Sequence, residues 1–295
     1  MDRKELYTLF KNSSLSETIP SKKDSSSTTT IRIIHYNVNL WKSFEGKCNF
    51  DSIIEWLSTC HADIICLNEC LFSSTSEVTK PLFVYKIKNK LGFPYITMAN
   101  DYYGINVVCS KFPFASSYTL PLLKDPIKKQ TRYALHIQFQ EWKNFHLLVT
   151  HLDAFDNTEQ TRLLQIKQIL NYMKEKNIQE SSLLLGDLNS LLQSDYTEEE
   201  WKEIKKQDLK IGLKETPTLV STELKDARFI DIVNSSNFEK GEKEKSIFIS
   251  CWSNRRIDMC YIHSSSLLQK QIKNCKFTKQ FYSDHFPLLI DLDLK

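Results

Sequence analysis

The polar side chains that could do chemistry in this sequence stand at the ends of short apolar runs. The stretch 181–193, SSLLLGDLNSLLQ, shows this best, because three leucines are followed at once by Gly186, Asp187 and Asn189. A carboxylate or an amide that is buried without partners costs about 1–3 kcal/mol or more. Gly-Asp and Asn-Ser are also ordinary turn residues, so this stretch alone favours a turn.

Five other runs carry a carboxylate, an amide or an imidazole at one end. These groups are Asn37 after IRIIHY, Asn68 and Glu69 after DIICL, His151 and Asp153 in HLLVTHLD, Asp258 at the start of DMCYI, and Asp284 and His285 before FPLLI. If the strands lie side by side in suitable directions, the groups converge on one rim of a sheet, where active sites are commonly built. The repeated placement therefore predicts a single site.

Three of these side chains are suited to holding a divalent cation. Glu69 and Asp284 are hard oxygen ligands and Asn37 adds an amide oxygen, a set that suits Mg²⁺. The sequence has no thiolate cluster and only two histidines belong to the set, which argues against a structural zinc.

The remaining groups fit hydrolysis at phosphorus. An imidazole held by a carboxylate, as in His285 with Asp258, is suited to proton transfer or to stabilising charge on a phosphate. Asp187 and Asn189 would orient an attacking water, one by accepting its proton and the other by fixing its lone pairs. Together the set predicts a phosphoester hydrolase.

Each residue taken singly also has an ordinary structural use. Asn37 fits a turn at a strand end, Glu69 a loop cap, and His151 a structural histidine whose hydrogen bonds are satisfied. Asp258 follows two arginines and fits a surface ion pair, which contributes under about 1 kcal/mol. The joint pattern, and not any single residue, favours the active site.

The elements that must position these groups are short strands with helices between them. Strand-like runs rich in Ile, Val, Leu and Tyr recur at 31–38, 62–67, 105–110, 133–139, 145–150, 182–186, 257–262 and 286–294. The last run alternates apolar residues with Asp291 and Asp293, which predicts a half-exposed strand. Apolar spacing predicts helices at 50–57 and 158–177, and a capping box at Thr197 opens a third. This order predicts an α/β domain whose sheet is covered by helices.

Composition divides the 295 residues into a tail, a domain and an insertion. Residues 1–30, which include NSSLSETIPSKKDSSSTTT, predict a disordered Ser/Thr-rich tail. With 41% hydrophobic residues in the chain, residues 31–295 predict a single catalytic domain with a substantial core. The stretch 191–246 is highly charged and predicts an insertion over that core.

Net charge, cysteines and targeting signals narrow the class of protein. A charge of +3 permits a phosphate-bearing partner without demanding one. The start of the chain lacks the apolar region of a secretory signal, and no apolar run approaches the 18 residues of a membrane span. The eight cysteines include no C-x-x-C pair, which favours reduced thiols. We expect a monomer in the cytoplasm or the nucleus.

The stretches YNVN, LNE, THLD, GDLNS, RRID and SDHFP, in this order, resemble the motifs of the endonuclease/exonuclease/phosphatase superfamily, which has the DNase-I-like fold. They extend from Ile31 to Leu294, over nearly all of the chain. The resemblance implies a four-layer α/β/β/α sandwich with two packed mixed β-sheets flanked by helices. It also implies phosphoester cleavage that depends on Mg²⁺ or Mn²⁺.

The resemblance further implies a role for each candidate residue. These roles are metal binding for Asn37, Glu69 and Asp284, water activation for Asp187 with Asn189, phosphate contact for His285 backed by Asp258, and stabilisation of the transition state or leaving group for His151. Members of the family differ in which group is the general base, so that assignment stays open.

Several positions depart from the family's pattern and bear on the branch. Asn68 stands where the family usually has Gln, and Cys70 and Leu71 stand where apurinic endonucleases have Thr-Lys. CWSNRRID is not the Trp-Cys-Asp-Arg motif of inositol polyphosphate 5-phosphatases, and neutral sphingomyelinases have His-Thr-Gln in place of HLD. The segment THLDAFDNTEQTRLLQIKQI resembles the branch that holds tyrosyl-DNA phosphodiesterase 2 and its relatives.

The first functional hypothesis is a metal-dependent phosphodiesterase or nuclease that acts on nucleic acid or a nucleic-acid adduct. The alternatives are a phosphatase or phospholipase for a lipid or small-molecule phosphoester, and an inactive scaffold, which the full set of acids and histidines disfavours. Lysine-rich stretches at 86–90, 124–132 and 273–279 would attract a polyanion if they border the site. Tyr102 and Tyr103 are aromatic candidates for stacking. The predicted substrate-binding residues are Asp153, Arg132, Trp252 and Phe281.

Overall fold

The computed structural model describes residues 29–72, 77–99, 105–124, 129–233 and 249–294. Its strands are β1 (Thr29–Asn37), β2 (Ile64–Cys70), β3 (Tyr95–Ala99), β4 (Ile105–Ser110), β5 (Phe114–Lys124), β6 (Thr131–Phe139), β7 (His146–His151), β8 (Ser182–Asp187), β9 (Phe229–Asp231), β10 (Asp258–His263), β11 (Ile272–Phe277) and β12 (Leu288–Leu294). Its α-helices are α2 (Phe50–Thr59), α3 (Lys80–Leu91), α4 (Gln160–Glu175), α5 (Glu198–Lys210) and α6 (Leu219–Asp226). Short 3-10 turns lie at Asn39–Trp41, Gln179–Ser181, Gln193–Asp195 and Leu267–Lys270.

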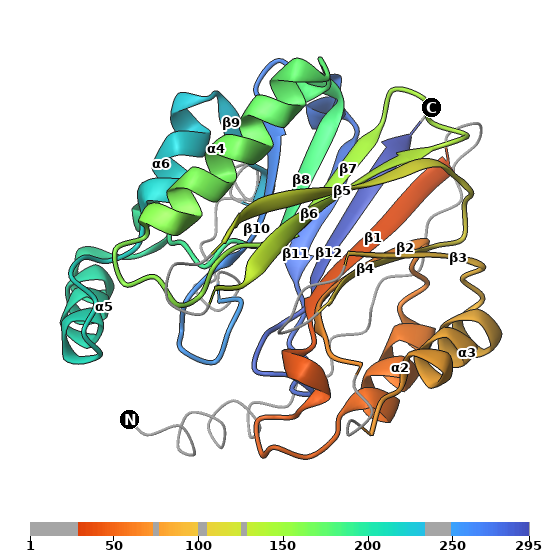
Figure 1. Cartoon of the computed structure of the whole chain (residues 1–295), viewed down its shortest axis with the longest axis horizontal. Coiled ribbons are helices and arrows are strands. Elements are labelled where there is room, and N and C mark those ends of the chain that lie inside the picture. The colour runs from red at the N-terminus through yellow and green to blue at the C-terminus, as the bar shows by residue number, and fades with distance from the viewer. Residues whose placement is uncertain (1–28, 73–76, 100–104, 125–128, 234–248, 295) are drawn as a thin grey trace.

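The strands form two six-stranded sheets that pack face to face. The first sheet has the order β11-β12-β1-β2-β4-β3 and the second has the order β5-β6-β7-β8-β10-β9. Within each sheet one pair is parallel, β1 with β2 and β7 with β8, and the other pairs are antiparallel. Figure 1 shows α2 and α3 outside the first sheet and α4 and α6 outside the second. The predicted four-layer sandwich with two mixed sheets is confirmed.

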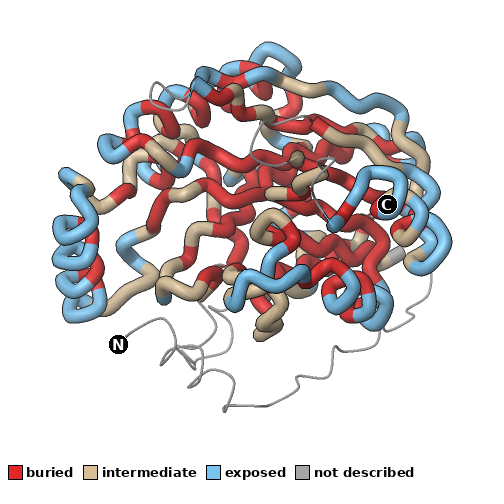
Figure 2. The backbone as a smooth tube through the Cα atoms, turned by 60° about the horizontal axis from the view of Figure 1, so that its bottom comes forward, coloured by how far each residue is buried: buried red, intermediate tan, exposed pale blue. Residues whose placement is uncertain are grey.

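The interior strands bury both of their faces, which explains their continuous apolar runs. In β1, Ile31 and Ile33 face the second sheet, whereas Ile34 packs under α2 and α3. In β8, Leu183 and Leu185 face the first sheet, and Leu184 packs under α4 and α6. Figure 2 shows the buried backbone concentrated in the middle of the molecule. Odd and even positions of one strand therefore serve different cores.

Strand β12 differs from the half-exposed strand that its alternation predicts. It lies between β11 and β1, and Asp291 is buried at 8% exposure. Arg32 of β1 donates to this carboxylate through Nε at 2.7 Å and through Nη2 at 3.1 Å. The aspartate marks a buried bidentate ion pair, because a partner 259 positions away in the sequence satisfies its charge.

The predicted helices are present with the expected buried faces. In α2 the buried residues include Phe50, Ile53, Ile54 and Leu57, which are spaced for one side of a helix. Helix α5 begins with a complete capping box. The Thr197 side chain accepts the backbone N–H of Glu200, and the Glu200 carboxylate accepts the backbone N–H of Thr197.

The segment predicted as an insertion contributes α5, α6 and the edge strand β9. The buried guanidinium of Arg256, just before β10, joins this segment to the sheet. Its Nε donates to the Asp195 carboxylate at 2.6 Å, and its Nη2 donates to the Asp231 carboxylate. Residues 234–246 of this segment and residues 1–28 of the tail lie outside the described residues. The boundaries of the tail and of the insertion stay predictions.

No disulfide joins any of the eight cysteines, all of which the structure describes, and only Cys48 is exposed. None of the helices in the described ranges is long and apolar enough to cross a membrane.

Candidate active site

The predicted strand ends meet at one end of the two sheets because of strand direction and register. Asn37 stands beside Asn68 in the parallel pair of β1 and β2, and His151 stands beside Asp187 in the parallel pair of β7 and β8. Strand β10 is antiparallel to β8, so its first residue, Asp258, pairs with Asp187. Strand β12 is antiparallel to β1, which brings the residues before it to the same end.

The site residues continue the alternation that faces the space between the sheets. In β8, for example, Leu183 and Leu185 belong to the inter-sheet core, and Asp187 occupies the next position on that face. The same alternation places His151 after Leu147 and Val149 in β7. The site is therefore the end of the inter-sheet core, where apolar side chains give way to polar ones.

Asn37 bridges two carboxylates that come from different sheets. Its Nδ2 donates to Oε1 of Glu69 and to Oδ2 of Asp187, at 3.1 Å in each case. Its Oδ1, the atom expected to face a metal, accepts the backbone N–H of Asn39 at 3.0 Å. Asn37 thus holds the two carboxylates next to each other.

Glu69 reaches this position through a β-bulge. The register between β2 and β4 shifts between Leu67 and Cys70, and Glu69 has φ +59°, which is uncommon for a residue other than glycine. Burial raises the pKa of Glu69, and the nearby Asp284 carboxylate adds to the rise, whereas His285 opposes it.

Gly186 is required before Asp187 because two strands approach closely there. A Cβ at this position would lie 1.9 Å from the backbone oxygen of Thr150, and the residue has φ +154°. Only glycine lets β8 pair with β7 up to Asp187. The GDLN stretch is thus the end of a core strand followed by a tight turn, in which Asn189 has φ +48° and its N–H donates to Oδ1 of Asp187 at 3.0 Å.

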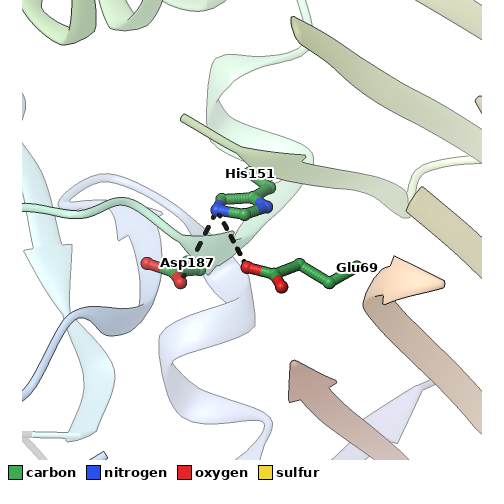
Figure 3. Close-up of side chains that lie close together, drawn as sticks. All are labelled: Glu69, His151 and Asp187. Carbon is green, nitrogen blue, oxygen red and sulfur yellow. Dashed lines mark ion pairs between the residues drawn. The ribbon is translucent and has the colours of Figure 1, made fainter. Parts of the chain in front are cut away.

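His151 lies between the two carboxylates (Figure 3). Its Nε2 is 3.7 Å from Oδ2 of Asp187 and 3.8 Å from Oε1 of Glu69. Its Nδ1 is 3.4 Å from Nη1 of Arg132, which can only donate, so Nδ1 accepts and Nε2 carries the hydrogen in the neutral ring. Burial, followed by the positive charges of Arg132 and His285, holds the pKa of His151 well below 6.5.

Asp258 holds two histidines. Its Oδ2 is 2.7 Å from Nδ1 of His285, and its Oδ1 is 3.0 Å from Nε2 of His35. Burial alone would lower the pKa of His285, but the charge and the hydrogen bond of Asp258 outweigh burial and hold that pKa well above 6.5. Burial would raise the pKa of Asp258, and the two histidines instead keep it below 3.8. This geometry shows a buried, charge-paired aspartate and replaces the alternative of a surface ion pair.

The carboxylates of the site repel one another. Burial, with a contribution from Asp258, raises the pKa of Asp187 from 3.8 to about 7. One ligand atom from each of Glu69, His151 and Asp187 lies within 4.8 Å of the other two, and the same holds for Asp187, Asp258 and His285. A cation would relieve the repulsion between these oxygens, so this donor set fits a divalent ion with oxygen ligands.

Asp284 and Asn189 lie beside this cluster. Oδ1 of Asp284 is 4.0 Å from Nε2 of His285 and accepts a hydrogen bond from Ser283 at 3.3 Å. Nδ2 of Asn189 donates to the backbone oxygen of Leu152 at 3.3 Å.

The predicted substrate-binding residues have different surroundings. Asp153 is buried, and its carboxylate accepts the N–H groups of Phe155 and Asp156, which shapes the loop after β7. Arg132 is buried beside His151. Trp252 and Phe281 are half-buried. The backbone N–H of Trp252 donates to the backbone carbonyl oxygen of Asp284 at 2.8 Å. Tyr102 and Tyr103 lie outside the described residues.

Sequence reasoning missed two buried residues of this region, His35 and Asn106. Both lie inside strands and not at strand ends, but both occupy positions that face between the sheets. His35 follows Ile31 and Ile33 by alternation, and Asn106 precedes Val108 in the same way. A polar residue on the inward face of a core strand was the signal that could have found them.

The comparisons with known proteins agree with this geometry. The model of the Endonuclease/Exonuclease/phosphatase family matches residues 36–203, more than half of the chain. No curated protein matches the chain by sequence.

Solved structures share the fold at low sequence identity. An AP endonuclease from Archaeoglobus fulgidus has a TM-score of 0.61 and 15% identity, over 90% of this chain and 100% of that one. The 3' phosphatase NExo from Neisseria, bound to a product DNA hairpin, has a TM-score of 0.60 and 16% identity, over 89% and 99%. TDP2 from D. rerio, in complex with a single-strand DNA product, has a TM-score of 0.56 and 16% identity, over 90% and 99%. At these identities the likeness establishes the fold alone.

Proposed function

Since the chain belongs to the endonuclease/exonuclease/phosphatase family of hydrolases, we propose that it is a divalent-metal-dependent phosphodiesterase that acts on nucleic acid or a nucleic-acid adduct. The observation that carries the proposal is the meeting of Asn37, Glu69, His151, Asp187, Asp258 and His285 at one end of the two sheets. The carboxylates of half-buried Glu69 and buried Asp187 lie next to a charged imidazole that a third carboxylate holds, a set that suits metal binding and proton transfer.

Glu69 would hold Mg²⁺ or Mn²⁺, with Asp284 as a further oxygen donor of the proposed metal site. Asn37 would join them as an oxygen donor by turning its amide over, because Nδ2 now faces Glu69 and Asp187 while Oδ1 faces the N–H of Asn39. The negative charge of Asp284 already acts on Glu69, which supports their joint role. The bound ion would supply a Lewis acid that polarises a phosphate oxygen.

The chain's own residues divide the remaining work. Asp187, at the end of β8 with its Oδ2 3.7 Å from Nε2 of His151, would accept a proton from the attacking water, with Asn189 orienting it. His285, charged through its bond to Asp258, would donate to the scissile phosphate as negative charge develops there. His151, neutral and with its hydrogen on Nε2, would donate to the leaving group or the transition state.

Two arguments support nucleic acid as the substrate class. The NExo structure is bound to a product DNA hairpin, and the D. rerio TDP2 structure is bound to a single-strand DNA product. Half-buried Trp252 and Phe281 lie near Asp284 and His285, where an aromatic ring could stack on a base. We also propose Arg132 and Asp153 as substrate-side residues, the first by charge and the second through the loop that it shapes.

A substrate panel tests the proposal. It contains single- and double-stranded DNA, RNA, a 5′-tyrosyl DNA adduct, a 3′-phosphorylated DNA, sphingomyelin and a phosphoinositide, each with Mg²⁺ and with EDTA. We expect metal-dependent cleavage of a nucleic-acid phosphodiester that Asp187→Ala abolishes. Cleavage of the lipids alone, or removal of the terminal phosphate alone, would contradict the proposed substrate or bond type. No hydrolysis of any member would contradict the proposed enzyme.

A further inference from the structure

A chain of side-chain amides links the two sheets directly beneath the candidate site. Oδ1 of Asn68 accepts the backbone N–H of Asp187 at 3.2 Å, and Nδ2 of Asn68 donates to Oδ1 of Asn106 at 2.8 Å. Nδ2 of Asn106 donates in turn to the backbone oxygen of Tyr133 at 3.0 Å. The chain runs from β8 to β2, on to β4 and across to β6, so it crosses between the sheets twice.

Backbone groups at both ends fix the direction of this chain. The N–H of Asp187 can only donate and the C=O of Tyr133 can only accept, so each amide must accept on one side and donate on the other. A half-turn of either amide would set donor against donor or acceptor against acceptor. Asn68 is 0% and Asn106 is 1% exposed, and unpaired polar atoms are costly at that depth. Each side chain is therefore held in one orientation.

The same chain supports the bulge at which Glu69 turns toward the site. Leu67 pairs with Val107 and Cys70 pairs with Ile105, so Asn106 is the residue of β4 that stands opposite the bulge. A bulge interrupts the backbone ladder, and the bond between Asn68 and Asn106 joins the two strands at this interruption.

We propose that Asn68 and Asn106 are positioning residues that set the separation between Glu69 and Asp187. The amide chain ties the bulge that carries Glu69, in the first sheet, to the last amide of β8, in the second. Asn37 then bonds to both carboxylates from the side of the site. The inference rests on the proposed function, because the separation of these carboxylates matters through the metal and the phosphate that they would face.

The positioning role differs from a merely structural one in what it changes. The amides of Asn68 and Asn106 do not face the proposed substrate. Removing either amide should therefore leave KM nearly unchanged but shift the carboxylates of Glu69 and Asp187 from their positions. Partners behind a ligand typically contribute about 10–100-fold in metal affinity or activity. The loss of an ordinary buried hydrogen bond lowers stability but leaves metal affinity and activity unchanged.

The first experiment compares Asn106→Leu with a matched control, Ser182→Ala, in the full chain. Ser182 is equally buried and donates to the oxygen of Ile178 at 2.6 Å, at the opposite end of β8 from Asp187. The readouts are the Kd of Mn²⁺ alone by calorimetry, the kcat and KM for the phosphodiester that the panel selects, and the melting temperature. If Asn106→Leu does not fold, Asn106→Ala takes its place with the same expectations.

We expect Asn106→Leu to weaken Mn²⁺ binding or lower kcat by about 10-fold or more, with KM changed by less than about 3-fold. Ser182→Ala should lower the melting temperature and leave Kd and kcat at the wild-type values. Equal Kd and kcat in Asn106→Leu and wild type would overturn the inference. A wild type that binds no Mn²⁺ and hydrolyses no phosphodiester would instead contradict the proposed function.

A double variant tests whether the two amides act as one unit. If they do, Asn68→Leu together with Asn106→Leu lowers kcat no further than Asn68→Leu alone, since the chain is already broken. Multiplied losses in the double variant would show independent roles and overturn the account of a single chain.

Discussion

Replacing Asp258 by asparagine tests whether this carboxylate keeps the imidazole of His285 charged. The carboxylate accepts from His285 through Oδ2 at 2.7 Å and from His35 through Oδ1 at 3.0 Å. An asparagine of the same shape has one acceptor, so its NH₂ group must face one of the two rings. In Asp258→Asn one of the two rings therefore faces an N–H donor and loses its hydrogen bond to residue 258.

The size of the effect follows from these two bonds. A hydrogen bond to a charged group contributes about 1.5–3 kcal/mol, which is the expected loss in the free energy of unfolding. Without the carboxylate, burial lowers the pKa of His285 against the charges of Asp187 and Asp284 alone, so the ring is charged to a smaller extent at neutral pH. A lost donor at a charged transition state costs about 3 kcal/mol, so we expect kcat to fall roughly 100-fold.

The matched control is Asp291→Asn, the same chemical change at another buried carboxylate. Asp291 lies in β12, away from the site, and its carboxylate accepts two hydrogen bonds from Arg32 of β1. We expect a comparable loss of stability and an unchanged kcat in this variant. Steady-state kinetics, urea unfolding and NMR titration of the His285 ring are the measurements. A kcat for Asp258→Asn within about 3-fold of wild type, with the pKa of His285 still raised, would refute the reasoning.

The pH dependence of the stability difference has a definite sign. The pKa of His285 is raised in the folded state, so its stabilisation is fully present below 6.5 and is lost as pH rises through the raised pKa. The pKa of Asp258 is lowered, so its stabilisation is present above 3.8 and is lost as pH falls through the lowered pKa. The difference between wild type and Asp258→Asn should therefore be largest between pH 3.8 and 6.5.

Three further results are expected. Mn²⁺ at 100 times its Kd should raise the free energy of unfolding by about 2.7 kcal/mol in wild type and much less in Glu69→Gln, as thermal melts with and without EDTA would show; equal melts for wild type in both buffers would contradict a metal site. Burial lowers the pKa of His136 from 6.5 to about 4, so in the unfolded chain this ring binds more protons in that window, and its contribution to stability should rise with pH between these values. His136→Phe should therefore change less favourably with pH than wild type in melts from pH 4 to 7, and equal slopes for the two proteins would contradict a lowered pKa of His136. Arg256→Met leaves two buried carboxylates without their shared partner and should cost about 3–5 kcal/mol in urea unfolding, whereas a loss below about 1 kcal/mol would show that the ion pairs matter little.

The strands that the sequence pattern predicted are the interior ones. Strands β1, β2, β4 and β12 of the first sheet, and β6, β7, β8 and β10 of the second, bury most of both faces and give short runs rich in apolar residues. Strands β3, β5, β9 and β11 escaped prediction, and each is an edge strand. Edge strands carry polar residues on an exposed face, as in FASSYTLPLLK of β5, so their sequences resemble loops.

The site residues that stand at strand ends could be predicted from the sequence. Asp187 and His151 stand where polar groups follow apolar runs, and strand direction brings them together. His35 and Asn106 were missed because their partners lie in the other sheet or in a neighbouring strand, and no local pattern gives that pairing. Asp291 gave the wrong prediction of a half-exposed strand for the same reason, since Arg32, the partner of its buried carboxylate, is remote in the sequence.

The most direct test of the central claim is the rate of hydrolysis of a simple activated phosphodiester, bis(4-nitrophenyl) phosphate, by wild type and Asp187→Ala in Mg²⁺. We predict that wild type hydrolyses it, that EDTA stops the reaction, and that Asp187→Ala folds normally with a rate about 10²–10⁴-fold lower. A folded Asp187→Ala protein that matches the wild-type rate would contradict the claim that this strand end delivers a catalytic carboxylate.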